Sequence, residues 1–403
     1  MSKERFRWHP DANDVYDGSL YGDTLLGDLP CSAFKKVNGK SFTMNAAGHV
    51  LTLAPIPGDI DVFIPWGAPL DGWESNPSLT EIAINSGTLE VISGESDPVA
   101  GIILQIGLED AVAKVDVKGN LIVRDVNVEG AALPADQGPK PGATINVYAG
   151  GTFVVGRGRS TRISGFAGSF DINVHDQGSM DVSAHIVDLA GGTYVVGGDA
   201  STTAQSSLKV IAAPASPASP VAESGSLRNG SFSIANYRVS CSAASTSLLQ
   251  GVSMSCTSTH MKAQDSASLS IACDSIAFDG VVNGNGNING HRAEGFENGT
   301  VFAVGRGAAD ITFSSAAGGP APFDFLSTTQ QYPNGLLNFI TDEGANKSRF
   351  RFLGIGSAFE FSAMLQKGLI TVDGTPDNGK RTTWRREADS ADPSKYYFTI
   401  YLK

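Results

Sequence analysis

A short pattern of apolar and polar positions recurs between about residues 80 and 200. Two apolar residues flank one small or polar residue, a short turn follows, and a glycine then precedes a new apolar run. The copies contain Ile82-Ala83-Ile84, Val115-Asp116-Val117, Ile145-Asn146-Val147, Ile172-Asn173-Val174 and Val187-Asp188-Leu189, followed by Gly87, Gly119, Gly151, Gly178 and Gly192. Because apolar residues two positions apart lie on one face of a β-strand, the pattern predicts short strands separated by tight turns.

The spacing of the glycines predicts how these strands assemble. They are separated by 32, 32, 27 and 14 residues, which indicates units of variable length that keep the same motif. Each unit has one apolar face, which it can bury only by stacking on its neighbours. We therefore expect an all-β chain folded as a parallel β-helix (β-solenoid), with the glycines in turns that a side chain would obstruct.

A second phrase, an aromatic residue followed closely by Val-Gly, occurs three times. The copies begin at Phe153, Tyr194 and Phe302. The repetition favours equivalent turns in equivalent coils. Two copies continue with Arg157 and Arg306, so the alternative is that these arginines bind anions. A phosphate loop is not favoured, because no Gly-Lys-Ser/Thr follows.

The same patterns predict three segments. Residues 1–75 lack the repeat and are rich in aromatic residues, which is typical of an N-terminal cap or a docking segment. Residues 76–319 contain the coils, with loop insertions near 131–142 and 201–229 that are rich in proline. Residues 320–403 predict a C-terminal cap or oligomerisation segment, with a helix over 357–367 and a strongly β-prone strand over 396–402.

Composition narrows the range of partners. Only 17% of the residues are charged, and the formal net charge is −12 without clusters of Lys or Arg. This balance argues against binding to nucleic acid or to anionic membranes. No apolar run is long enough to span a bilayer, so we expect no membrane insertion.

The first residues have charges but no apolar core, unlike a Sec signal peptide. We therefore expect an extracellular, cell-surface or virion-like location that is reached without a Sec signal peptide.

Three of the four cysteines lie in one serine-rich region. Cys241, Cys256 and Cys273 are 15 and 17 residues apart, a spacing that favours an inward ladder of cysteines in neighbouring coils. A disulfide between Cys241 and Cys256, or between Cys256 and Cys273, is the alternative that spacing leaves open. With no C-x-x-C pair and only His260 nearby, we expect neither a metal site nor a cofactor. Cys31 is isolated.

The coil phrase over about residues 80–315 resembles the right-handed parallel β-helices of bacterial surface adhesins, phage tailspikes and polysaccharide lyases. The stretch over 350–374, with Phe-Arg-Phe, a short helix and Gly-Leu-Ile-Thr-Val-Asp-Gly, is similar to the C-terminal ends of some secreted bacterial β-helix proteins. The resemblance implies a right-handed β-helix with non-repetitive, aromatic-rich caps at both ends. Its motifs are architectural, so it implies no catalytic residues.

Candidate chemistry lies on the predicted outer face of the coils. If Ile172 and Val174 point inward, the residues that alternate with them point outward. The same register aligns equivalent residues of earlier coils in an outer column, and Asp181 points outward past the next turn. The candidate glycan-binding residues are Asp116, Asn146, Asp171, Asn173, His175, Asp181 and His185. Two carboxylates roughly 5–10 Å apart can catalyse glycoside hydrolysis, whereas a merely solvated polar face needs no ligand.

These observations favour a non-catalytic structural or adhesive subunit of an extracellular fibre, surface layer or phage-like appendage. The alternative is a carbohydrate-active enzyme, a hydrolase or lyase of tailspike type, that acts through the outer acids. The four tryptophans, at positions 8, 66, 73 and 384, lie outside the coils, which leaves few platforms for sugar rings there. We expect a homo-oligomer formed through both ends, either a trimer or a head-to-tail fibre, with a surface glycan as a possible further partner.

Overall fold

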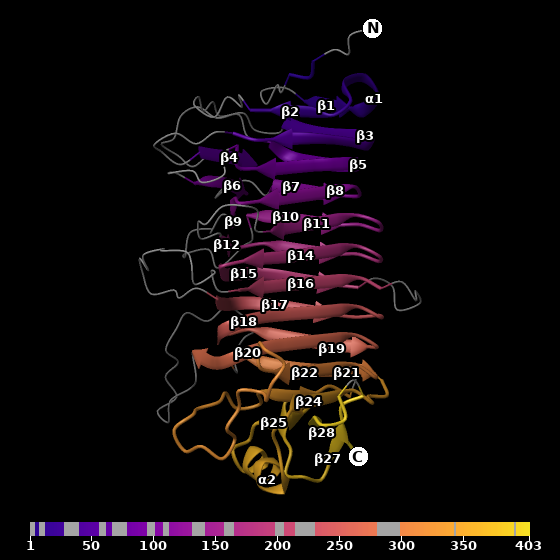
Figure 1. The fold of residues 1–403 in the computed structure, drawn as a ribbon. Coiled ribbons are helices and arrows are strands. Elements are labelled where there is room, and N and C mark those ends of the chain that lie inside the picture. Colours follow the sequence, from indigo (N-terminus) through magenta and orange to yellow (C-terminus); the bar gives the residue numbers. More distant parts are fainter. Residues whose placement is uncertain are drawn as a thin grey trace. The chain divides into compact units, whose positions relative to one another are not determined.

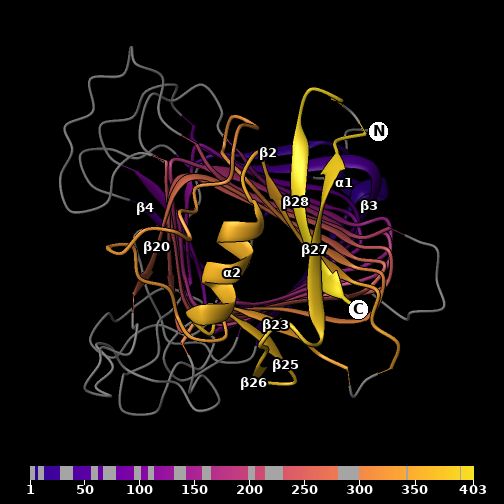
Figure 2. The same cartoon turned by 90° about the horizontal axis from the view of Figure 1, so that it is seen from below.

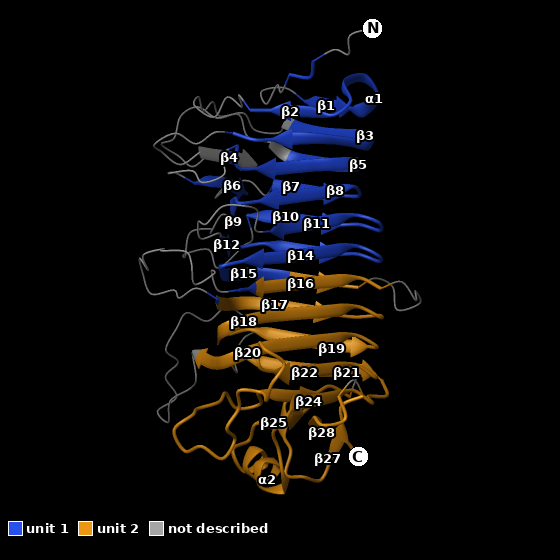
Figure 3. Cartoon of the chain, viewed as in Figure 1, with its two compact units in different colours: residues 1–193, 212–230 blue, residues 194–211, 231–403 orange. Residues whose placement is uncertain are grey.

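The computed structural model describes most of the chain in separate stretches. These are residues 5–7, 13–27, 40–55, 62–66, 79–94, 101–107, 113–130, 142–156, 165–197, 205–213, 230–279, 299–341, 344–390 and 392–403. The chain divides into two compact units. Unit 1 comprises Met1–Thr193 and Ala212–Gly230, and unit 2 comprises Tyr194–Ile211 and Ser231–Lys403 (Figure 3).

Strands dominate both units. Unit 1 contains α1 (Gly18–Tyr21) and the strands β1 (Asp14–Asp17), β2 (Thr24–Leu26), β3 (Lys40–Leu53), β4 (Val62–Trp66), β5 (Leu79–Ile92), β6 (Ile102–Ile106), β7 (Ala113–Val117), β8 (Asn120–Arg124), β9 (Asn127–Gly130), β10 (Ala143–Val147), β11 (Thr152–Gly156), β12 (Gly165–Gly168), β13 (Asp171–Val174) and β14 (Ser179–Ala184). Two strands, β15 (Ile186–Val196) and β16 (Ser207–Ala212), have residues in both units.

Unit 2 contains β17 (Ser231–Cys241), β18 (Thr246–Thr257), β19 (His260–Asp265), β20 (Ser268–Asp279), β21 (Val301–Gly307), β22 (Asp310–Ser314), β23 (Leu337–Phe339), β24 (Arg349–Leu353), α2 (Ala358–Gln366), β25 (Ile370–Val372), β26 (Thr375–Pro376), β27 (Thr382–Ala388) and β28 (Tyr396–Leu402).

Parallel ladders build unit 1. One ladder runs β5–β7–β10–β13, and a second runs β5–β8–β11–β14. A third runs β4–β6–β9–β12, and β12 also pairs with the first residues of β15. Strands of one ladder lie one after another in Figure 1. Parallel stacking also extends before residue 76, because β3 pairs with β5 and β1 pairs with β3.

Alternating apolar residues fill the interior of unit 1. Ile82, Val115, Ile145 and Ile172 are register partners on successive strands, and each is fully buried. Burying one such aliphatic side chain contributes about 1.5–3 kcal/mol. The predicted assignment of these residues to the inner face is therefore confirmed.

The recurring glycines are explained by close approach between successive turns. A Cβ on Gly151 would lie 2.2 Å from the carbonyl oxygen of Val117. On Gly119 it would lie 2.6 Å from the oxygen of Gly87, and on Gly178 it would lie 2.5 Å from the oxygen of Val147. The prediction that a side chain would obstruct these turns is confirmed, and the obstructing atom belongs to the preceding turn.

Unit 2 also consists of parallel ladders, and it ends in an antiparallel sheet. One ladder runs β17–β18–β20–β22–β24, and another runs β17–β19–β21–β23–β25. β28 pairs antiparallel with β24 on one side and with β27 on the other. The predicted C-terminal strand is thus confirmed, and both of its edges are hydrogen-bonded within the chain.

A short helix and an aromatic core complete unit 2. The predicted helix is confirmed as α2, whose N-cap Ser357 accepts a hydrogen bond from the backbone N–H of Phe359. α2 lies at the same end of unit 2 as β27 and β28 (Figure 2). Phe313 and Phe352 stack with ring centroids 4.8 Å apart, within a cluster of buried aromatic rings.

The predicted right-handed parallel β-helix, or β-solenoid, is wrong. Eleven strands close into a parallel β-barrel with further strands flanking it, and strand accounts for 62% of the structure, so the chain remains mostly β. The long strand β5 shows how separate ladders are joined, because it pairs with both β7 and β8. A repeated pattern of apolar residues predicts that strands stack along a ladder. It does not predict which strands connect one ladder to the next.

The cysteine ladder is also wrong. Cys241, Cys256 and Cys273 are buried and form no disulfide, but their register partners are other residues: Ala263 for Cys241, Phe278 for Cys256 and Gly251 for Cys273. Spacings of 15 and 17 residues do not match the step between paired positions, which is 22 residues for each of these three pairs.

Several expectations concern residues outside the described part of the chain. Arg157, Cys31 and nearly all of the 131–142 insertion lie there. The 201–229 insertion is described only at residues 205–213, which form β16 and its flanks. The other arginine considered for anion binding, Arg306, forms an ion pair of 2.9 Å with Asp265.

Candidate functional site

The outward side chains of β7, β10 and β13 form one continuous surface on unit 1, which we call the polar face. It consists of three neighbouring columns, because parallel strands keep residue partners side by side. The columns contain Lys114, Thr144 and Asp171; Asp116, Asn146 and Asn173; and, just beyond the strand ends, Lys118, Tyr148 and His175.

The middle column is a chain of side-chain hydrogen bonds. Asn146 donates from Nδ2 to Oδ1 of Asp116 at 2.8 Å, and Asn173 donates from Nδ2 to Oδ1 of Asn146 at 2.9 Å. Asn146 is 7% exposed, because its neighbours in the column cover it. The predicted alignment of Asp116, Asn146 and Asn173 is confirmed, and the alignment fixes the orientation of each amide.

An aromatic column borders these amides. The rings of Tyr148 and His175 stack with centroids 4.7 Å apart and an interplanar angle of 3°. The ammonium of Lys118 lies 5.5 Å from the centroid of the Tyr148 ring, within the range of a cation–π interaction. Burial, followed by the nearby Asp116 carboxylate, raises the pKa of Tyr148, so its hydroxyl stays protonated. The column therefore places aromatic rings, stacked on each other, beside hydrogen-bonding groups.

The column of Lys114, Thr144 and Asp171 supplies charged side chains. Lys114 donates to Oδ2 of Asp116 at 2.6 Å and lies 3.7 Å from Glu81. The hydrogen bond to Asp116 raises the pKa of Lys114. Asp171 accepts a hydrogen bond of 2.6 Å from the hydroxyl of Thr193. Both acids on this face thus act as acceptors for groups of the protein.

The structure brings together five of the seven predicted site residues. Asp116, Asn146, Asp171, Asn173 and His175 share the polar face. Asp181 is on β14, a strand of the second ladder, where its register partner is Val154. His185 is 5% exposed, and its carbonyl accepts a hydrogen bond from the N–H of Gly230. Asp181 and His185 are therefore not part of this surface.

Sequence reasoning missed four residues of the polar face: Lys114, Lys118, Thr144 and Tyr148. A signal for two of them is present, since Lys118, Tyr148 and His175 each follow the last valine of an equivalent strand. If the residues after these valines had been aligned as equivalent positions, Tyr148 would have been predicted to lie beside His175. Lys114 occupies the position two residues before Asp116, and alternation places it on the same face.

The arrangement suits recognition of a polar ligand better than catalysis. Asp171 lies two strands away from Asp116 and two residues out of register with it, which corresponds to about 12 Å between their Cα atoms. Lys114 and Asn146 donate hydrogen bonds to Asp116, and Thr193 donates one to Asp171, so both carboxyl groups already accept hydrogen bonds from the protein. Within the described residues, no group of three or more His, Cys, Asp or Glu side chains could hold a metal ion.

Comparison with known proteins finds no matching family model, curated protein or solved structure. The resemblance to β-helical adhesins, tailspikes and lyases is therefore corrected together with the fold that it implied. In the part of the chain that the structure describes, no helix has the length and apolar character needed to cross a membrane.

Proposed function

We propose that this protein is a non-catalytic structural or adhesive subunit that binds a glycan through the polar face. One observation carries the proposal: the hydrogen-bonded column Asp116–Asn146–Asn173 runs beside the stacked rings of Tyr148 and His175. Sugars present hydroxyl groups around the rim of an apolar ring face. A row of fixed amides offers hydrogen-bond partners for the hydroxyl groups, and the neighbouring aromatic side chains offer apolar contact for the sugar ring.

The column also favours binding because its geometry is already fixed. Its members are anchored to adjacent strands and to one another, so little side-chain freedom is lost when a ligand binds. Successive members of a column are separated by the spacing of the strands, about 4.8 Å. An extended chain of sugars can therefore contact several strands at once.

The test is a glycan array probed with the purified protein, followed by affinity measurements on the glycan that binds best. We expect Tyr148→Ala to weaken binding about tenfold, since an aromatic contact contributes about 1 kcal/mol or more. Asn120→Ala is the matched control, because Asn120 lies on β8 and its amide donates to Thr88 at 3.2 Å. Absence of glycan binding, or equal loss in both variants, contradicts the proposal.

The alternative function, a carbohydrate-active enzyme, is distinguished from a binding subunit by whether the bound glycan is cleaved. A binding subunit leaves the chain length of the polysaccharide unchanged during prolonged incubation. Shortening of the polysaccharide that is abolished by Asp171→Asn would identify an enzyme. Asp181→Asn serves as the control, because Asp181 lies on the other ladder.

We also propose that the protein acts as a homo-oligomer at an extracellular, cell-surface or virion-like location. Light scattering coupled to size exclusion tests the first part. A monodisperse monomer at micromolar concentration would contradict it. Deletion of residues 396–403 is not a suitable test of oligomerisation, because it would disrupt the fold of unit 2. β28 pairs with both β24 and β27, and its Phe398 and Ile400 are buried.

A further inference from the structure

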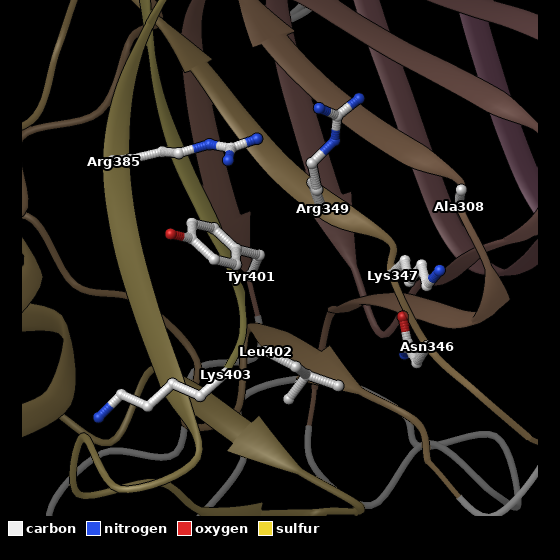
Figure 4. A pocket seen from close by; sticks show the side chains of 8 residues that line it. All are labelled: Ala308, Asn346, Lys347, Arg349, Arg385, Tyr401, Leu402 and Lys403. Carbon is white, nitrogen blue, oxygen red and sulfur yellow. The ribbon is translucent and has the colours of Figure 1, made fainter.

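A cavity lies beside the antiparallel sheet of unit 2. Its volume is about 540 Å³, and Figure 4 shows the side chains that line it. The lining residues are Ala308, Asn346, Lys347, Arg349, Arg385, Tyr401, Leu402 and Lys403. Four of them have cationic side chains, and none of the lining side chains is acidic, although the chain as a whole has a net charge of −12. We call this site the cationic pocket.

Strand alternation gathers these cations. Phe350 and Phe352 are buried on β24, so Arg349 and Arg351 lie on the opposite face of the strand. Arg349 pairs with Tyr401 of β28, and Thr399 of β28 pairs with both Arg351 and Arg385. The side of the sheet β24–β28–β27 opposite Phe350 and Phe352 therefore presents arginine side chains from two strands.

Two acidic side chains form ion pairs with the arginines but do not neutralise all of the positive charge that lines the pocket. Arg349 makes a bidentate pair with Asp310, with Nε–Oδ1 and Nη2–Oδ2 distances of 2.8 and 2.7 Å. Arg385 forms an ion pair with Glu387, whose other oxygen accepts from Thr399 at 2.8 Å. The guanidinium edge that faces the acid is occupied in both arginines, and Nη1 of Arg349 also lies 3.7 Å from Oε2 of Glu387. The cations that line the pocket outnumber the two acids, so the electrostatic potential favours an anion.

Lys347 and the Tyr401 hydroxyl offer further donors. Within the described residues, neither group has a hydrogen-bond or ion-pair partner, and Lys347 is exposed. Asn346, in contrast, uses its amide to donate to the carbonyls of Val304 and Ile340 at 2.9 and 2.8 Å. Lys403 donates to the carbonyl of Gly379 at 2.6 Å, which places its ammonium at the rim.

We propose that the cationic pocket binds a small organic anion of sugar size that carries a carboxylate, sulfate or phosphate group. The volume falls within the range of small-molecule sites, roughly 300–1,000 Å³, and exceeds what an inorganic ion fills. Leu402 and the Tyr401 ring supply apolar contact for the body of the ligand, while Lys347, Arg349 and Arg385 bind its charge. The site is on unit 2 and does not depend on glycan binding by the polar face of unit 1.

The experiment is titration calorimetry of the full chain with glucuronate, glucose 6-sulfate and glucose 6-phosphate. Glucose tests the need for charge, and inorganic phosphate tests the need for the organic body. We expect at least one charged sugar to bind with a Kd below about 1 mM and to weaken at high salt. Glucose and inorganic phosphate should bind at least about tenfold more weakly.

Lys347→Met tests the location of the site. It removes one charge without breaking a hydrogen bond that the fold uses, so the variant should unfold at the wild-type temperature. We expect it to weaken binding at least about tenfold, because a charge-assisted hydrogen bond is lost. Lys209→Met, on an exposed lysine of β16, is the matched control and should bind like the wild type.

Three results would overturn the proposal. One is that no charged sugar binds more tightly than glucose. Another is that Lys347→Met binds as the wild type does. The third is that inorganic phosphate binds as tightly as the charged sugars, which would make the pocket a site for an inorganic ion.

Discussion

Asn173 donates a hydrogen bond of 2.9 Å to Oδ1 of Asn146, a residue 27 positions earlier in the chain. The bond exists because β10 and β13 are in parallel register, which places the two side chains side by side. Asn146 passes the interaction on by donating to Asp116 at 2.8 Å. Its amide therefore uses its donor and its acceptor in two different directions along the same column.

Removing the central amide should destabilise the fold. Asn146→Ala leaves Asp116 and Asn173 each without one partner, and Asn146 is 7% exposed, so water reaches the site poorly. We expect a loss of about 1–3 kcal/mol in the free energy of unfolding, measured with urea. Asn120→Ala breaks a single, more exposed hydrogen bond and should cost less; a larger loss in Asn120→Ala would contradict the importance of the column.

Two adjacent glycines provide a matched pair of substitutions. Gly151→Ala places a Cβ 2.2 Å from the oxygen of Val117 and should cost about 3 kcal/mol or more. Gly150→Ala meets nothing within 4 Å but must adopt a φ of +78°, which should cost about 1–2 kcal/mol. Thermal unfolding of the two variants measures the difference. Equal losses would mean that backbone conformation, and not contact between turns, determines the choice of glycine.

Glu387 should make the stability of unit 2 depend on acidic pH. Burial alone would raise the pKa of Glu387, but hydrogen bonds from Thr399 and Arg385 and the charges of Arg385 and Arg349 lower it below the ordinary 4.5. A lowered carboxyl pKa contributes stability that is present above the ordinary value and is lost as pH falls through the lowered value.

We therefore expect wild-type stability to decrease as the pH falls below 4.5. Glu387→Gln should be about 1 kcal/mol less stable at neutral pH and should lose less stability on acidification. Denaturant titrations over a series of pH values measure both effects. A variant with the same dependence on acidic pH as the wild type would show that Glu387 does not cause it.

The buried thiols should be inert in the folded protein. Burial raises the pKa of Cys241 to about 11, although a hydrogen bond to Ser247 opposes the rise. Burial and the nearby Asp274 raise the pKa of Cys273 to about 12. Since the thiolate is the reactive form, alkylation followed by peptide mass spectrometry should label neither residue until denaturant is added. Labelling at neutral pH in the native state would contradict their burial.

The local structure of this chain could be read from its sequence to a large extent. Alternation at Ile172 and Val174 predicted the inner face, and the equivalent position of Asp116, Asn146 and Asn173 predicted their column. The helix predicted over residues 357–367, from apolar residues on one face and the glycine that follows, is present as α2. These features depend on short-range periodicity, which a single sequence displays directly.

The global arrangement could not be read in the same way. The long strand β5 pairs with two ladders, through β7 and β8, and no local residue pattern encodes that choice. For the site, Asp181 was grouped with Asp171 because they are close in sequence, but the turn between β13 and β14 carries them to different ladders. The stacked ring of Tyr148 was missed because it lies just past the end of its strand.

The cationic pocket was hidden for a similar reason. Its residues come from segments that are separated by up to about 95 positions and meet only in the sheet β24–β28–β27. The sequence shows Arg349 and Arg385 as isolated charges in an acidic chain. Antiparallel pairing, which the pattern of apolar residues does not specify, brings them to one face.

Carbene footprinting of the protein with and without its best-binding glycan tests the central claim most directly. The reagent labels exposed side chains, so a ligand on the polar face should reduce labelling of the peptides that contain Tyr148 and His175. Labelling of Asn120 and Asp181, on the second ladder, should not change; it is read residue by residue, because His175 and Asp181 share one tryptic peptide. Protection of the second ladder instead, or no protection at saturating glycan, would contradict glycan binding through the polar face.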